Sequence, residues 1–167
     1  MLKVRLVAAS IGIAMMLLVS STLVAQTENK APDAPVPSQI FTAKKIFISN
    51  VGTPFDSNVW SGGSIRIYNE FYAAMKSWGR YELIAAPGEA DLVLDVDVVP
   101  SSSSADWKFK LEILDPKTRI VLWTQYEPMK ITPLQKSRDK NFDETIGKLV
   151  VDLKKLTAQP ADVKAPQ

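Results

Sequence analysis

The stretch from Ala90 to Pro100, ADLVLDVDVVP, decides the fold of this chain. Aliphatic and acidic residues alternate along it, and successive side chains of a β-strand point to opposite faces of the sheet. One face would hold Leu92, Leu94, Val96 and Val98, and the other Asp91, Val93, Asp95, Asp97 and Val99. We therefore expect a strand whose first face lies in a hydrophobic core and whose second face lies in water.

The same alternation returns after a serine-rich loop, in WKFKLEILD from Trp107 to Asp115. A short loop between two such strands predicts an antiparallel hairpin. Matching the apolar faces places Asp95 and Asp97 beside Lys108 and Lys110 in water, where each opposite-charge pair contributes about 0.2–1 kcal/mol. We expect that replacing both aspartates by asparagine leaves the fold intact and changes its stability by about 1 kcal/mol or less.

Asp95 and Asp97 also admit three chemical interpretations. Asp-Val-Asp matches a metal-holding motif of nucleotide-sugar glycosyltransferases, but those folds need a far longer chain. Weak calcium binding stays open, although the glycine and terminal glutamate of an EF-hand loop are missing. A carboxylate pair at this spacing suits glycoside hydrolysis, but an open sheet face offers no sugar cleft. The favoured interpretation is a solvated strand face paired with lysines.

Runs of β-branched and aromatic residues predict three more strands. They are KKIFISNV (44–51), RYELIA (80–85) and RIVLWTQYE (119–127), the last of which we expect to end at Pro128.

Two stretches have helical spacing. In the first, Ser64 is a predicted N-cap and Gly79 a predicted stop, with an apolar face of Ile65, Tyr68, Phe71, Tyr72, Met75 and Trp78. In the second, Asn141 and Glu144 form a predicted capping box, followed by an apolar face of Phe142, Ile146, Leu149, Leu153 and Leu156.

These elements predict an α+β fold with the order β-α-β-β-β-β-α. Because the central strands have one polar face, the sheet should be covered on one face only, and two helices with one apolar stripe each suffice for that. We therefore expect a two-layer sandwich of a mixed, mostly antiparallel sheet with two helices on one face.

The chain begins with a short cationic segment, an apolar run and small residues up to Ala25. This layout is typical of a secretory signal, and an uncleaved anchor remains the alternative. Either way the domain is delivered outside the cytoplasm, so we expect a periplasmic or secreted protein, anchored in the inner membrane if the leader stays. The predicted organisation is a leader over 1–25, a proline-rich linker over 26–42, the domain over 43–157 and a disordered tail over 158–167.

The amino-acid composition excludes several common kinds of catalytic site. The 167 residues include no Cys and no His, which rules out disulfides, thiolate zinc sites, cysteine nucleophiles and Ser-His-Asp triads. The 20 basic residues include Lys3 and Arg5 of the leader, so the rest of the chain has equal numbers of bases and acids. We therefore predict no enzyme, no cofactor, no metal and no nucleic-acid partner.

The loop before the first predicted helix is the candidate contact site, through Phe55, Trp60, Ser61, Gly62, Gly63 and Ser64. Exposed aromatic residues often anchor a protein partner, and backbone N–H groups at a helix start can hold an anion. The alternatives are that Trp60 packs over the helix end and that WSGGSIR is a flexible connector with an N-cap.

Two segments resemble exported bacterial proteins. WGRYELIAAPGEADLVLDVDV and LEILDPKTRIVLW are similar to the amino-terminal domain of the Tol-system protein TolB and to CsgG-like envelope accessory domains, over about residues 45–156. The resemblance implies a mixed sheet with two helices and a role in binding envelope components. No β-propeller repeats follow, and no lipidation cysteine is present.

The sequence thus predicts an exported, non-enzymatic domain that binds another envelope protein or surface, either through this loop or through an uncovered strand edge. A binder of small ligands or carbohydrates that uses Trp60 and its loop is the alternative, and a hydrolase is the third.

Overall fold

The structure is a computed structural model that describes residues 34–50, 59–100 and 106–158, so the leader, Phe55 and nearly all of the predicted tail lie outside the described residues. The elements are α1 (Ser38–Thr42), β1 (Lys45–Ser49), α2 (Ile65–Trp78), β2 (Glu82–Leu83), η1 (Pro87–Glu89), β3 (Leu92–Pro100), β4 (Asp106–Leu114), β5 (Val121–Lys130) and α3 (Gln135–Ala158). No helix in these ranges is both long and apolar enough to cross a membrane.

The five strands form one mixed sheet in the order β2-β1-β3-β4-β5. β1 runs parallel to β2 and β3, whereas β3, β4 and β5 are antiparallel neighbours. Val98 faces Phe109 and Val96 faces Leu111 across the β3–β4 pair, which confirms the predicted hairpin and the matched apolar faces.

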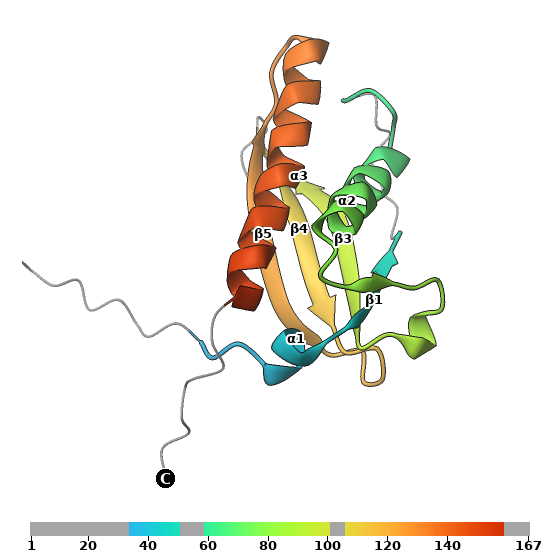
Figure 1. Cartoon of the computed structure of the whole chain (residues 1–167). Helices are drawn as coiled ribbons and strands as arrows, with labels where there is room; N and C mark the ends of the chain where they lie inside the picture. The colour runs from blue at the N-terminus through green and yellow to red at the C-terminus, as the bar shows by residue number, and fades with distance from the viewer. Residues whose placement is uncertain (1–33, 51–58, 101–105, 159–167) are drawn as a thin grey trace, which may run out of the picture. The chain divides into compact units, whose positions relative to one another are not determined.

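Both long helices, α2 and α3, cover the same face of the sheet (Figure 1). The core between the layers is built from the alternating strand residues and from one stripe of each helix. Its fully buried members include Ile46, Leu92, Leu94, Phe109, Leu111, Phe71, Phe142 and Leu149. The predicted α+β class is confirmed, and the order of elements along the chain roughly matches the predicted one, with a third, short helix added.

The start of the domain was predicted too late. Residues 26–42 were assigned to a linker, but Ser38–Thr42 form α1, and Ile40 is fully buried in the core. The prolines that favour a linker stop at Pro37, where proline is tolerated before the first turn of a helix. The packed fold therefore includes the last residues of the predicted linker.

Two boundaries at the far end of the chain were also wrong. β5 continues through Pro128, which is compatible with a strand because β5 lies at the edge of the sheet. α3 begins at Gln135, so Asn141 is no N-cap and its side chain instead donates to the carbonyl of Lys130. The first two turns of α3 consist of polar residues, so they lack the helical spacing of apolar residues from which a helix is predicted.

The predicted limits of α2 are confirmed, but its face and its cap differ. Gly79 ends the helix in the left-handed conformation, with φ of 67°. Ser64 precedes the helix without a capping bond from its side chain, because its backbone is already helical. Ile67 joins Phe71 and Met75 on the buried face, whereas Ile65 is 46% exposed.

Candidate functional site

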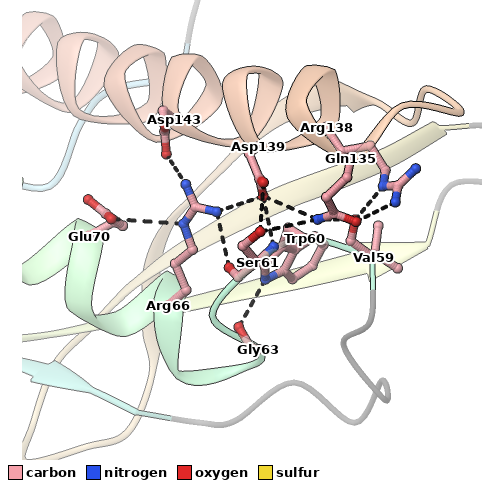
Figure 2. Close-up of polar contacts among 10 residues, drawn as sticks. All are labelled: Val59, Trp60, Ser61, Gly63, Arg66, Glu70, Gln135, Arg138, Asp139 and Asp143. Carbon is pink, nitrogen blue, oxygen red and sulfur yellow. Dashed lines mark hydrogen bonds and ion pairs between the residues drawn. The ribbon is translucent and has the colours of Figure 1, made fainter.

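The loop that was predicted as a contact site is fastened to α3 by one carboxylate. The amide nitrogen and the hydroxyl of Ser61 both donate to Asp139, each at 2.7 Å, and Arg66 of α2 donates to the same carboxylate at 2.8 Å (Figure 2). The bonds from Ser61, followed by Arg66, lower the pKa of Asp139. Of the predicted anion-binding groups, the Ser61 amide is thus engaged by a carboxylate of the chain itself.

Arg66 joins the two helices at this point. Its guanidinium pairs with Asp139 and Asp143 of α3 and lies 3.8 Å from Glu70 on its own helix. It also stacks 4.5 Å from the centre of the Phe142 ring. Because planar guanidinium groups hold several acceptors in a fixed geometry, the start of α2 is held in place against the amino-terminal part of α3.

The other end of the loop is fastened to the first turn of α3. The Arg138 side chain donates to the carbonyls of Val59, Thr132 and Pro133, and Gln135 donates to the carbonyl of Val59 at 3.5 Å. Residues 59–65 and 131–135 therefore form one connected surface, which we call the loop end.

Trp60 lies under this surface and is 3% exposed. Its ring packs edge-on against Trp107 at 5.8 Å and also contacts Phe109 and Phe142, while its indole nitrogen donates to the carbonyl of Gly63. The sequence offered Trp60 as a possible contact residue and favoured packing over the helix end, and its indole is a core side chain.

The remaining predicted contact residues are mostly at the surface. Ser61, Gly62 and Ser64 are exposed, and Gly63 is half-buried. Gly62 has a φ of 88° and Gly63 a φ of 68°, values that residues with a side chain rarely adopt. A Cβ atom added to Gly62 would lie 3.3 Å from the Cδ atom of Arg66. The two glycines let the loop turn back over Arg66.

Asp91, which directly precedes β3, and Asp95 and Asp97 within β3 have three different surroundings. The Asp91 carboxylate accepts from the backbone N–H groups of Lys44 and Lys45 at 2.8 and 2.9 Å. Asp97 faces Lys110 in the sheet, as predicted, and accepts from the adjacent amide of Val98.

Asp95 does not lie beside a lysine, which corrects the prediction. Its neighbour across the β3–β4 pair is Glu112, and Lys110 binds Glu112 at 3.3 Å. One oxygen of Asp95, Oδ1, is buried and has no hydrogen-bond partner within the part of the chain that the structure describes. The matched faces were predicted correctly, but alternation alone does not give the register that sets Asp95 opposite Glu112 and Asp97 opposite Lys110.

The described residues hold no group of three or more acidic side chains that could bind a metal ion. At the loop end, Asp139 and Asp143 are already engaged by Ser61 and Arg66. This arrangement favours a fixed contact surface over proton transfer. The sequence did not identify Arg66 or Asp139, although Arg66 is spaced four residues from Glu70 on its helix and Asp139 four residues from Asp143.

No protein-family model matches the chain, and no curated protein matches it by sequence. Among solved structures, the chain is similar to a point variant of PelC from Paraburkholderia phytofirmans, described as a dodecamer, with 12% identity and a TM-score of 0.48 over 71% of this chain and 93% of that chain. It is also similar to a Xanthomonas campestris protein of the DUF330 family model, with 12% identity and a TM-score of 0.49 over 72% and 86%.

A third similar structure is a neuraminyllactose-binding hemagglutinin homologue from Helicobacter pylori, with 13% identity and a TM-score of 0.44 over 71% of this chain and 87% of that chain. All three similarities are partial matches of the backbone fold at low sequence identity.

Proposed function

We propose that this chain is an exported, non-enzymatic module that binds another component of the cell envelope through its loop end. The observation that carries the proposal is a pair of exposed apolar side chains beside a fixed loop. Leu134 is 70% exposed and Ile65 is 46% exposed, at the starts of α3 and α2. Exposed apolar side chains next to polar groups are typical of protein contact surfaces.

The fixed loop supports this assignment, because ordering a surface on binding costs free energy that a preformed surface avoids. Ser61 is held by Asp139, and the carbonyl of Leu134 accepts from the amides of Ser137 and Arg138. The backbone on both sides of the exposed pair is therefore in place before a partner arrives.

The strand edge is a weaker contact site than the loop end. β5 is ten residues long and lies at the edge, but Pro128 near its end has no N–H group to offer a partner strand. The carbohydrate alternative needs an exposed aromatic platform, and Trp60 is buried. These two features favour a protein contact at the loop end.

Export is supported by the leader, and a role among envelope components is supported by the resemblance to the TolB amino-terminal domain. The non-enzymatic part of the proposal is supported by the absence of Cys and His from the sequence and by the engaged carboxylates of the loop end.

Site-specific photo-cross-linking in living cells tests the proposal. A photoreactive residue at position 134 is compared with one at position 151, since Val151 is 47% exposed on α3 but lies outside the loop end. We expect one discrete adduct with another envelope protein from position 134 and none from position 151. No adduct from position 134, or the same adduct from both positions, would contradict the contact surface.

A further inference from the structure

A recess lies on the sheet face opposite the helices and is separate from the loop end. It has a volume of about 320 Å³, within the range of small-molecule sites. It lies over β1, β3 and β4 and is bordered by the turn that joins β4 to β5.

The floor of this recess consists of two cross-strand rows. Phe47, Val93 and Leu114 are register partners and form an apolar row of half-buried side chains. Ser49, Asp95 and Glu112 form the next row, which is polar. All of these side chains except that of Glu112 line the recess, so it offers an apolar surface directly beside a carboxylate.

The carboxylate of Asp95 is the unusual member. Its Oδ1 atom is buried and receives no hydrogen bond in the described part of the chain. Neither of its two register partners supplies a donor to that oxygen, and Lys110 is engaged by Glu112. A buried carboxylate oxygen without a donor is costly, and most such atoms in folded proteins are satisfied by a partner.

The rim gives the recess its charge. Its charged lining consists of Asp95, Asp115 and Arg119, two carboxylates against one guanidinium. Arg119 is held in a left-handed conformation with φ of 63°, and its amide donates to the carbonyl of Asp115 at 2.9 Å. The lining is therefore net negative. The buried side-chain oxygen that lacks a partner among the described residues is an acceptor, and both features favour a cationic donor.

We propose that this recess binds a small primary amine that carries a short apolar chain. The Asp95 side chain turns its buried Oδ1 toward the recess as the ammonium group donates to it, and the apolar chain lies on the row of Phe47, Val93 and Leu114. An ammonium supplies the missing donor and the opposite charge together, whereas an alcohol supplies only the first. The inference does not rest on the proposed contact at the loop end, and either can fail without the other.

An NMR titration of the chain, as recovered from the cell after export, tests this inference with n-hexylamine as the probe. Hexanoate and n-hexanol, which have the same chain length, are the matched ligands. We expect saturable binding of hexylamine, with shifts at Phe47, Val93 and Leu114, at least tenfold weaker binding of hexanol and no binding of hexanoate.

Two variants separate the proposed contact from general effects. Asp95→Asn should weaken hexylamine binding at least tenfold, because it removes the charge. Asp97→Asn is the control, since Asp97 lies on the same face two residues further along and accepts from its own neighbour Val98; it should bind hexylamine as the unmodified chain does. If Asp95→Asn fails to fold, the carboxyl ¹³C resonance of Asp95 in the unmodified chain replaces it and should shift as amine is added.

The proposal is overturned if hexylamine fails to saturate, if hexanoate binds as well as hexylamine, or if Asp95→Asn binds with unchanged affinity. It is equally overturned if the Asp95 carboxyl resonance stays fixed while amine is added, which would leave a bound water as the partner of that oxygen.

Discussion

At the scale of single residues, Asp91 just before β3 and Asp95 and Asp97 within it show that a position on one face of a strand does not decide what a carboxylate does. Asp91 fastens the start of β1, Asp97 accepts from the adjacent amide, and Asp95 keeps a buried oxygen without a partner. Alternation predicted their common face correctly. The partners could not be predicted, because they depend on the register with β1 and β4 and on the path of the chain before β1.

Asp91→Ala should destabilise the fold by about 1 kcal/mol, because two backbone N–H groups lose an acceptor at an exposed site. Urea unfolding measures the change, and Glu89→Ala, an exposed neighbour in η1, is the control. The N–H groups of Lys45 and then Lys44 lower the pKa of Asp91 below its ordinary 3.8.

The contribution of Asp91 is therefore complete above the ordinary pKa and disappears as the pH falls through the lowered one. The difference in stability between the unmodified chain and Asp91→Ala should stay constant from neutral pH to about pH 5 and shrink in stronger acid. A difference that grew on acidification would contradict this assignment.

Asp139→Ala should release the loop without unfolding the domain, because Ser61 loses the acceptor of both its amide and its hydroxyl. Hydrogen exchange at the Ser61 amide should accelerate several-fold, while exchange in β3 and β4 stays unchanged. Glu144→Ala, which removes only the exposed pair with Lys140, is the control. Since the pKa of Asp139 is lowered, Ser61 in the unmodified chain should keep its protection until the pH falls below the usual aspartate range.

Asp95→Val should stabilise the fold by about 1 kcal/mol, because it removes a buried acceptor without a donor and places a β-branched residue in a central strand. Asp97→Val in the same strand is the control for β-propensity alone. Urea unfolding should show a clearly larger gain for Asp95→Val. Equal gains would mean that the buried oxygen carries no cost.

At the scale of helices and strands, the sequence predicts elements that have a repeating hydrophobic pattern and misses elements or turns that are short or polar. The strands were found because their alternation persists over many residues, as from Leu92 to Val98. α1 has five residues between prolines and polar residues, too few for a helical period. The early turns of α3 are held by contacts of Arg138 and Gln135 with distant carbonyls, which no local pattern can show.

Ile40→Ala tests whether α1 belongs to the packed core. Ile40 is fully buried, so the substitution should cost about 2 kcal/mol or more, whereas Ile65→Ala at an exposed site should cost well under 1 kcal/mol. Thermal unfolding of the two variants gives the comparison. Equal and small effects would mean that the linker indeed reaches residue 42.

At the scale of the whole molecule, α2 and α3 cover one sheet face (Figure 1). The loop end has fixed backbone and exposed apolar side chains, and the opposite sheet face holds the recess around Asp95. The sequence pointed to the loop before α2, but it showed neither the segment 131–135 beside that loop nor the recess, because each surface joins segments that are far apart in the chain.

The most direct test of the central proposal compares cross-linking from position 134 in the full chain and in a chain that lacks residues 1–25. The account predicts a discrete adduct with an envelope protein from the full chain only, since the truncated chain stays in the cytoplasm and never meets its partner. The same adduct from both chains, or no adduct from the exported one, would contradict an exported module that binds through its loop end.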